Sequence, residues 1–374
     1  MTEVISPYRI PVLNEICKSE AIQFKVFFLA ETVPERLWRV EKEKIQFNYT
    51  VLPGLRIPLP KQFPIFFNHT ITKALKDEAP DIVICGGYHH PSCFLALRYA
   101  KRYGKRVLLW SESHEDSVRL KGFPFDWYRN RFIHSCDGFL IPGRKSFDFI
   151  QSFGINGKKV WTAPNAVNNE FFSTRSKLAR SHAEANRIKK GFPRKVILYV
   201  GRLIDVKGIP ILLKAFNDIS KSIEEVGLVL VGEGRDRRKY EGFCKKQGLC
   251  NVFFEGFKQQ EDLPFYYGLA DVFVLPSLQE EWGLVLNEAA ASGLPLIGTT
   301  VSGAAFDLIE DGKNGYCVPA GDAESLKTRI IQILTDSQLK IAMGRLSASK
   351  SQEFSPSRCA KGFFQAILNG ENQK

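Results

Sequence analysis

The stretch "DVFVLPSLQEEWGLVLNEAAASGLPLIGTT" (271–300) contains one strand–helix–strand unit. Its first apolar run, DVFVLPS, is short and is closed by a proline and a serine, which is typical of a buried strand. An apolar helical pattern follows and ends at Gly293, with Pro295 just beyond, before the next apolar run. Strands that alternate with helices in this way indicate an α/β fold with a parallel sheet.

The same alternation extends in both directions from this stretch. In the second half, further apolar runs lie at 196–202, 227–234, 251–257 and 315–320. In the first half, comparable runs lie at 24–30, 81–87, 106–112 and 138–143, and a helical pattern lies at 91–105. Two doubly wound parallel sheets are therefore expected, each covered by helices on both faces.

A break in the alternation separates the two halves. "APNAVNNEFF" (163–172) is rich in turn residues, and a polar, basic stretch follows it at 173–195. A chain of 374 residues is also longer than one hydrophobic core usually serves. We therefore expect a first domain over 1–168 and a second over 169–354, with an amphipathic helix after them.

Charge and cysteine usage narrow the classes of partner and compartment. The chain has 52 Lys and Arg against 40 Asp and Glu, a net charge of +12 that favours an anionic partner. Its eight cysteines are scattered without a C-x-x-C pair, which argues against a zinc site and fits a reducing, cytoplasmic setting. The sequence predicts neither a signal peptide nor a membrane-spanning run, so any membrane contact is expected to be peripheral.

Charged residues and glycines lie where strands of the second half end, and ligands bind beyond such ends in doubly wound sheets. Arg202 and Lys207 share one loop, where an arginine fork and a lysine point charge can converge on a diphosphate. The alternative is a solvated loop whose charges have no common partner. Gly232, in "VGEG", admits a ligand close to the backbone, although tight turns use the same residue.

Two carboxylates flank the start of the predicted helix at the centre of the opening stretch. Glu280 lies in the preceding loop and can accept hydrogen bonds from hydroxyl groups. The helix start near Gly283 offers free N–H groups to an anion. Glu288 lies among apolar residues and can accept from a vicinal diol, as an acidic residue does on ribose in other nucleotide folds. The alternative for Glu288 is a salt bridge in the core, which is costly.

These motifs together resemble those of a known family. Glu280 and Glu288, separated by seven residues, resemble the E-x7-E motif of the family-4 retaining glycosyltransferases, and "GRLIDVKG" (201–208) resembles their G-R-L-x-x-x-K-G. "VGEG", "FEGF", "YYGLADVFVLPS" and "EDGKNGYCV" occur in the family's order, and "PNAV" (164–167) is similar to its interdomain segment. The resemblance is dense over residues 160–365 and looser before them.

The resemblance implies a GT-B architecture of two facing Rossmann-like domains with a deep interdomain cleft. The first domain would bind the acceptor, and the last helix, within 355–374, would cross back onto it. The second domain would bind a nucleotide-sugar. The implied donor residues are Arg202 and Lys207 for the diphosphate, Glu288 for the ribose, Phe257 for the base, and Glu280 with the backbone of Trp282, Gly283 and Leu284 for the sugar and phosphate.

Candidates for the acceptor side lie in the first half. His114, in "LLWSESHED", falls where the family often has an active-site histidine, although a lone loop histidine is more often structural. Tyr88 and His89 follow "CGG" at a predicted strand end, and Tyr8 lies in "SPYRIP", where family members often have a Gly-Gly loop. The resemblance thus assigns catalysis to His114 together with Arg202, Lys207 and Glu280.

Two residues of the second half depart from the family pattern. Asp307 stands where a glutamate is common, and Trp282 replaces a commoner phenylalanine.

The resemblance therefore implies a retaining, metal-independent hexosyltransferase that uses UDP-glucose or another UDP-hexose and needs no cofactor. The expected acceptor is a growing surface polysaccharide or a lipid-linked glycan. One alternative is a nucleotide-sugar epimerase on the same fold. A basic nucleic-acid-binding module is another, but no compact basic stripe with stacking aromatics supports it, so no nucleic-acid partner is expected.

Two aromatic and basic stretches of the first half point to a further partner, an anionic membrane surface. They are "KQFPIFFNH" (61–69) and "RLKGFPFDWYRNRF" (119–132). Aromatic rings suit the headgroup boundary, and lysine and arginine suit anionic lipids. The alternative is that these rings lie in the core or line an acceptor groove. The expected location is the cytoplasm, with peripheral attachment to the inner face of the membrane.

Overall fold

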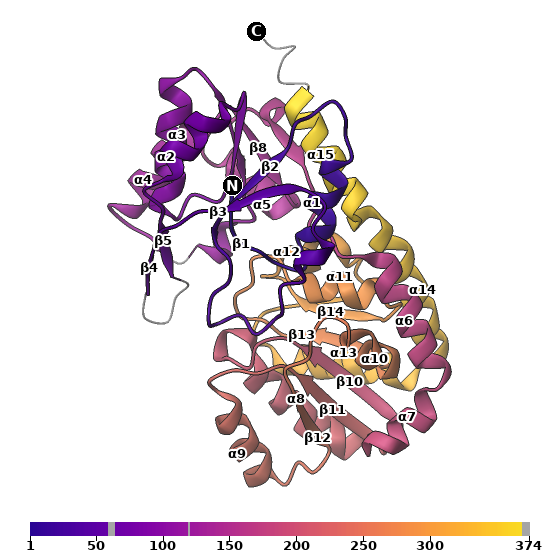
Figure 1. The fold of residues 1–374 in the computed structure, drawn as a ribbon. Helices are drawn as coiled ribbons and strands as arrows, with labels where there is room; N and C mark the ends of the chain where they lie inside the picture. The colour runs from indigo at the N-terminus through magenta and orange to yellow at the C-terminus, as the bar shows by residue number, and fades with distance from the viewer. Residues whose placement is uncertain (59–63, 119, 369–374) are drawn as a thin grey trace. The chain divides into compact units, whose positions relative to one another are not determined.

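The computed structural model describes residues 1–58, 64–118 and 120–368 (Figure 1). The chain divides into two compact units. Unit 1 comprises Met1–Ala166 and the segment that begins at Pro356, and unit 2 comprises Val167–Ser355. The first crossing between them lies in the turn-rich segment where the sequence predicts a domain boundary.

Unit 2 is built on a six-stranded sheet in which all neighbouring strands are parallel. The order β12-β11-β10-β13-β14-β15 places the first two strands of the unit, β10 and β11, inside the sheet, as in dinucleotide-binding folds. The direction of winding reverses between β10 and β13, so the loops after these two strands are neighbours. The strands are β10 (Lys195–Val200), β11 (Val226–Val231), β12 (Val252–Gly256), β13 (Val272–Leu275), β14 (Leu296–Thr299) and β15 (Gly315–Val318).

Helices cover this sheet and connect its strands. The basic stretch after the boundary forms two helices, the first capped by the Asn168 side chain. The helices are α6 (Asn169–Ser181), α7 (Ala183–Lys190), α8 (Ile209–Ser222), α9 (Arg237–Gln247), α10 (Leu263–Leu269), α11 (Leu284–Ala291), α12 (Gly303–Leu308), α13 (Ala323–Thr335) and α14 (Ser337–Ser351), with short 3-10 turns η4 (Asp205–Lys207) and η5 (Gln352–Phe354).

Unit 1 contains a three-stranded and a four-stranded parallel sheet and one antiparallel hairpin. The two parallel sheets adjoin, because the Met1 ammonium donates to the Ile84 carbonyl and Gly86 N–H donates to the Met1 carbonyl, each at 2.8 Å. The orders are β1-β2-β3, with β1 (Thr2–Val4), β2 (Lys25–Ala30) and β3 (Asn48–Val51), and β6-β7-β8-β9, with β6 (Ile82–Gly86), β7 (Arg106–Trp110), β8 (Gly138–Ile141) and β9 (Val160–Thr162). The hairpin pairs β4 (Leu55–Ile57) with β5 (Ile65–Phe67).

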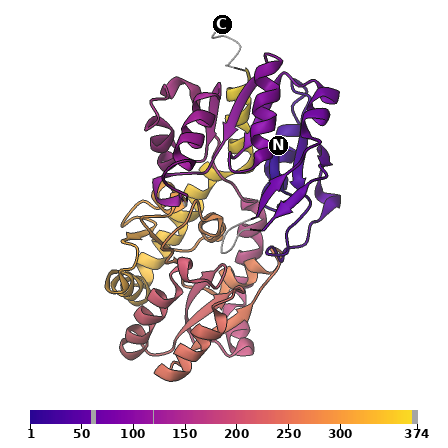
Figure 2. The same cartoon turned by 90° about the vertical axis from the view of Figure 1, so that its left-hand side faces the viewer.

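The helix from the C-terminal end of the chain belongs to unit 1, where it packs beside α1 (Figures 1 and 2). Phe363 meets Trp110 edge to face at 5.0 Å, and Arg106 donates to the carbonyls of Ala366 and Ile367. The helices are α1 (Ile10–Cys17), α2 (Ile71–Glu78), α3 (Pro91–Arg102), α4 (Phe125–His134), α5 (Arg144–Gln151) and α15 (Pro356–Leu368), with short turns η1 (Lys42–Lys44), η2 (Glu115–Ser117) and η3 (Gly157–Lys159).

The α/β prediction is confirmed, and every predicted strand is present. The strands that the sequence did not predict are β1, β3 and β9 and the hairpin, all of them short. β4 has no buried face that a sequence pattern could reveal, because it is exposed along its length. None of the helices in the described ranges is both long and apolar enough to cross a membrane.

Candidate functional site

The loop after β10 makes a tight turn, and this turn fixes the position of Lys207. Gly201 has a φ of 153°, and the Tyr199 hydroxyl donates to the Arg202 carbonyl at 2.9 Å. Burial raises the pKa of Tyr199 well above its ordinary value, with a contribution from the nearby Glu280 carboxylate, so this hydroxyl stays a donor. The half-buried Arg202 follows, and the η4 turn ends at Lys207.

Lys207 and Glu280 meet because the loops after β10 and β13 are joined through their backbones. The N–H groups of Leu278 and Gln279 both donate to the Val206 carbonyl. The Lys207 ammonium forms an ion pair with Glu280 Oε2, and the Ser277 hydroxyl donates to the same oxygen at 3.1 Å. Both charged side chains are mostly buried, with 14% and 12% exposed. The two predicted residues therefore form one charged pair at the point where the sheet reverses its winding.

Glu288 is fully buried on α11. The Tyr267 hydroxyl, from α10, donates to Glu288 Oε2 at 2.6 Å. A buried carboxylate needs such donors, because an uncompensated charge in the core is costly. Tyr267 supplies Glu288 with one such donor.

The start of α11 is held by backbone contacts around Trp282. Gly283 precedes the helix with a φ of 100°, and a Cβ there would lie 2.8 Å from the Leu275 side chain. The Trp282 ring is buried and donates to Asn287 at 2.9 Å, while its carbonyl accepts from the Ser302 hydroxyl at 2.6 Å. The indole therefore anchors the loop.

Gly232 and Phe257 lie at the ends of β11 and β12. Gly232 N–H donates to the Gly256 carbonyl at 2.9 Å, and a Cβ on Gly232 would lie 1.9 Å from the Gly201 carbonyl. Only glycine fits between these strand ends. Phe257 follows Gly256 directly and is half-buried.

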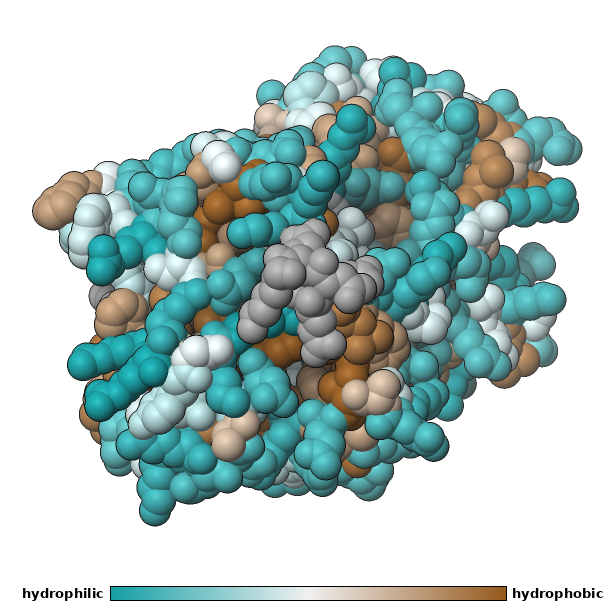
Figure 3. Space-filling view, turned by 90° about the horizontal axis from the view of Figure 1, so that it is seen from above, coloured by the Kyte–Doolittle hydropathy of each residue, from teal (hydrophilic) through white to brown (hydrophobic). Residues whose placement is uncertain are grey.

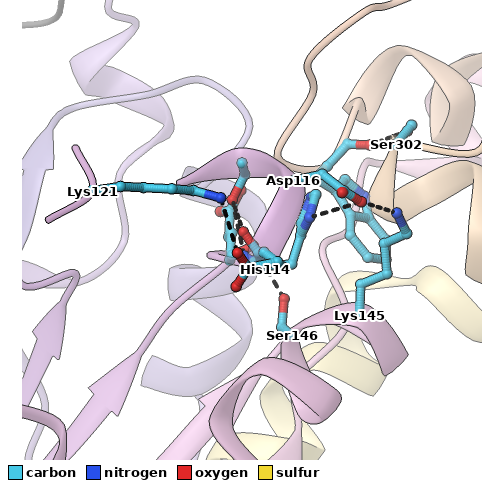
Figure 4. Close-up of polar contacts among 10 residues, drawn as sticks. His114, Asp116, Lys121, Lys145, Ser146 and Ser302 are labelled. Atoms are coloured by element: carbon cyan, nitrogen blue, oxygen red, sulfur yellow. Dashed lines mark hydrogen bonds and ion pairs between the residues drawn. The ribbon is translucent and has the colours of Figure 1, made fainter. Parts of the chain in front are cut away.

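His114 of unit 1 lies in a polar cluster after β7 (Figure 4). It is 2% exposed, and its backbone N–H and carbonyl both bond to the Ser117 hydroxyl. Its Nδ1 lies 3.9 Å from Asp116 Oδ2, and the Lys145 ammonium lies 2.6 Å from that same oxygen. Asp116 is thus shared between the imidazole and a lysine at the start of α5.

The other acceptor-side candidates differ in exposure. Tyr88 is buried in the core of unit 1, and its carbonyl accepts from the Tyr128 hydroxyl at 3.0 Å. His89 is exposed, with its ring 4.3 Å from that of Tyr88. Tyr8 meets Trp38 edge to face at 6.4 Å. Of the pair after β6, only His89 presents its side chain to solvent.

A second charged group of unit 1 was not predicted from the sequence. Arg9 lies 4.3 Å above the Trp110 ring, and its guanidinium is 3.4 Å from Glu112. Glu3 lies nearby on β1, and burial raises its pKa. The position of Glu112 directly after a strand was visible in the sequence, but Arg9 is 103 positions away in the chain.

No group of three or more His, Cys, Asp or Glu residues in the described ranges is arranged to hold a metal ion.

Two family profiles match this chain, one in each unit. The profile of the glycosyl transferases group 1 matches residues 182–348, and that of glycosyltransferase family 4 matches residues 21–171. This chain belongs to the family-4 glycosyltransferases. The profiles confirm the family resemblance, and solved glycosyltransferases of similar fold confirm the GT-B fold class.

Relatives of known name include two transferases and one solved structure. The sulfoquinovosyl transferase SQD2 of Arabidopsis thaliana is 27% identical over 274 residues, 70% of this chain and 51% of that protein. The GDP-mannose-dependent alpha-mannosyltransferase of Corynebacterium glutamicum is 28% identical over 309 residues, 78% of this chain and 68% of that protein. HepE of Anabaena, solved with UDP and glucose, is 16% identical with a TM-score of 0.73, covering 98% of each chain. The chain spans about half the length of several curated relatives that it matches.

Proposed function

We propose that this chain is a retaining glycosyltransferase that transfers a hexosyl group from a UDP-hexose, such as UDP-glucose, to a glycan. The acceptor would be a growing surface polysaccharide or a lipid-linked glycan, and the enzyme would act in the cytoplasm. The observation that carries the proposal is the Lys207–Glu280 ion pair at the reversal point of the unit 2 sheet, with the buried Glu288 eight residues after Glu280.

In this proposal unit 2 binds the donor. Arg202 and Lys207 bind the diphosphate, and the backbone at Trp282, Gly283 and Leu284 adds the N–H groups of a helix start. Glu288 accepts from the ribose hydroxyls after a shift that admits them beside Tyr267, and Phe257 borders the base. A UDP donor is supported by HepE, which is solved with UDP and glucose. The mannosyltransferase relative, named for GDP-mannose, makes the base the first point to test.

The reaction breaks the bond between the sugar C1 and the phosphate oxygen and forms one between C1 and the acceptor oxygen. The acceptor hydroxyl loses its proton to the departing phosphate on the same face of the sugar. Negative charge grows on that phosphate, so Arg202 and Lys207 stabilise the transition state more than the ground state. Lys207 must then leave Glu280 in part, which frees that carboxylate to accept from sugar hydroxyls.

Unit 1 binds the acceptor in this proposal, with His114 as the residue closest to the chemistry. The Lys145 ammonium fixes Asp116, and Asp116 borders Nδ1 of the imidazole. His89 and Tyr8 would contact more distant parts of the acceptor.

Calorimetry with UDP-, GDP- and ADP-hexoses tests the donor site directly. We expect UDP and UDP-hexoses to bind, and the binding to weaken in Glu288→Ala. If a GDP- or ADP-hexose binds while UDP-hexoses do not, the UDP assignment is wrong, although the transferase proposal stands.

An assay of UDP release separates transfer from epimerisation. A transferase releases UDP in proportion to acceptor, whereas an epimerase releases none in net turnover. EDTA should leave the rate largely intact, because lysine and arginine carry the charge stabilisation. A complete loss with EDTA that Mn²⁺ restores would contradict the metal-free mechanism.

A further inference from the structure

Unit 1 exposes a group of large apolar side chains where α4 begins. We name it the aromatic surface, and it comprises Leu120, Phe123, Phe125 and Trp127 with Phe94 of α3. Phe123 is 86% exposed, the highest value for a large hydrophobic side chain in the described ranges. Trp127 is 58% exposed. Exposed apolar residues that occur singly need no explanation, but a cluster of aromatic residues marks an interaction site.

The aromatic surface is held in place by polar contacts beneath it. Arg129 is 8% exposed and donates to the Leu120 carbonyl at 2.6 Å and to Asp126 at 2.7 Å. Asp126 in turn accepts from Gly122 N–H at 2.7 Å. The Phe94 ring lies 6.3 Å from that of Tyr128, which links α3 to α4. A buried arginine therefore fixes the loop that presents Phe123, so the exposure of that ring is built into the fold.

Two exposed arginines lie one helical turn from residues of the aromatic surface. Arg131 lies one helical turn after Trp127, with its guanidinium 5.8 Å from the indole ring. Arg98 lies one turn after Phe94 on α3, and both arginines are exposed. Unit 1 as a whole has 27 Lys and Arg against 17 Asp and Glu, whereas unit 2 has 25 against 23. Almost all of the excess positive charge of the chain therefore belongs to the unit that carries the aromatic surface.

We propose that the aromatic surface docks onto an anionic lipid bilayer. Amphipathic rings favour the headgroup boundary, and arginine pairs with anionic headgroups while its stem packs on apolar surface. Figure 3 shows one face of the molecule, on which most residues are hydrophilic and smaller hydrophobic areas lie among them. This inference does not depend on the proposed function, because it concerns residues outside the candidate site.

The structure also limits which predicted stretch takes part. Residues 61–63 and Arg119 lie outside the described residues. In the first stretch Phe66 is 2% exposed and packs against the His90 ring, so this phenylalanine is a core residue. Docking is therefore assigned to the second stretch alone.

Vesicle flotation tests the proposal with the full chain. Vesicles of phosphatidylglycerol and phosphatidylcholine, or of phosphatidylcholine alone, are mixed with protein at low and high salt. We expect flotation with the anionic vesicles at low salt and at least a tenfold weaker partition at high salt. The double variant Phe123→Ser/Trp127→Ser should lose at least tenfold in partition, and Arg98→Gln/Arg131→Gln should flatten the salt dependence.

The matched control is Leu178→Ser/Ile188→Ser in unit 2. These side chains are 66% and 74% exposed, and they lie on α6 and α7 among many basic residues. We expect this control to float like the wild type. Far-ultraviolet circular dichroism melts of all variants confirm that each remains folded.

Three outcomes would overturn the proposal. The wild type could fail to float with anionic vesicles at low salt, or the control could lose as much partition as the aromatic double variant. The third is a concentration-dependent dimer in sedimentation without lipid that Phe123→Ser/Trp127→Ser abolishes, which would assign the aromatic surface to a second copy of the chain.

Discussion

Unit 2 packs the ends of its strands against one another, whereas a comparable strand end in unit 1 is open. In unit 2 a Cβ on Gly208 would lie 1.8 Å from the Pro276 carbonyl, and one on Gly232 would lie 1.9 Å from the Gly201 carbonyl. In unit 1, Gly87 follows β6 with a φ of 103°, and a Cβ there would meet no described atom within 4 Å. The loops that follow the strands are therefore closely packed at these two glycines of unit 2 and open at Gly87 of unit 1.

This difference matches the kinds of ligand proposed for each unit. Where backbone atoms of neighbouring loops lie this close, the loops tolerate few substitutions. Such a rigid site suits a ligand that is always the same, such as a nucleoside diphosphate. After β7, unit 1 instead gathers titratable side chains, among them Glu112 and His114.

The largest effect is expected at the Lys207–Glu280 pair. Lys207→Ala should lower kcat by roughly 10²–10³-fold, the usual cost of removing one donor that stabilises transition-state charge. The donor KM should change less, because the partner charge grows only as the bond breaks. Steady-state kinetics measures both constants.

Lys214→Ala, at an exposed lysine on α8, is the matched control and should retain wild-type kinetics. The double variant Lys207→Met/Glu280→Gln checks that the loss is not due to an unpaired, mostly buried Glu280. A rise in donor KM with unchanged kcat would assign Lys207 to ground-state binding instead.

Glu288→Gln should weaken the binding of UDP and UDP-hexose alike. A hydrogen bond to a charged group contributes roughly 1.5–3 kcal/mol, so the dissociation constant should rise about ten- to a hundredfold. Tyr267→Phe removes the internal bond to Glu288 but keeps the carboxylate, and it should affect UDP binding less. Calorimetry compares the two. Equal UDP affinity in wild type and Glu288→Gln would leave Glu288 a purely structural residue.

Much of unit 2 could be predicted because its information is local. Each strand is a short apolar run, and Arg202, Lys207 and Glu280 follow such runs within a few residues. Even there, the Lys207–Glu280 pair joins loops 73 positions apart, and only the order of strands in the sheet brings them together. The Tyr267–Glu288 bond was missed because a tyrosine in an apolar run gives no sign of its partner.

Unit 1 could be predicted less well because its polar contacts are distant in sequence. Lys145 meets Asp116 across 29 positions, since α5 begins beside the loop after β7. The strands β1, β3 and β9 are too short to give a sequence pattern of their own, and their place in a sheet depends on the strands with which they pair. The exposed rings around Phe123 were predicted only as a stretch of aromatic and basic residues, because one sequence cannot separate Phe123 from the buried Phe132.

A smaller effect, on stability, is expected for Gly208→Ala. Gly208 and Gly191 have nearly the same left-handed backbone, with φ of 71° and 68°, but a Cβ on Gly191 would meet no described atom within 4 Å. Both substitutions carry the left-handed penalty of about 1–2 kcal/mol. Gly208→Ala should cost a further 1–3 kcal/mol, the usual range for overpacking. Urea unfolding measures both, and equal losses would mean that the packed strand ends of unit 2 yield freely.

The smallest effect concerns pH and should be confined to unit 1. His90 is buried at the start of α3, and burial, with a contribution from the neighbouring His89, lowers its pKa to about 3. Its neutral Nδ1 accepts from Phe66 N–H at 3.2 Å, and Glu3 lies 3.8 Å from its Nε2. In the unfolded chain His90 takes up a proton near its ordinary pKa of about 6.5.

Between about pH 6.5 and 3 the unfolded state therefore binds more protons at His90, and stability falls as the pH falls. One proton contributes up to about 1.4 kcal/mol per pH unit. Glu3, whose pKa is raised by burial, acts in the opposite direction, so wild type and variants are compared over the same range, pH 7 to 5.5. His90→Asn keeps an acceptor for Phe66 N–H and should flatten the dependence of stability on pH, whereas His182→Asn, at an exposed histidine of unit 2, should not.

Hydrogen exchange followed by mass spectrometry measures the two units separately. In wild type, β5 and β6 should lose protection on acidification, while β10 should not. Equal loss in β6 of wild type and His90→Asn would show that another group controls the acid response of unit 1.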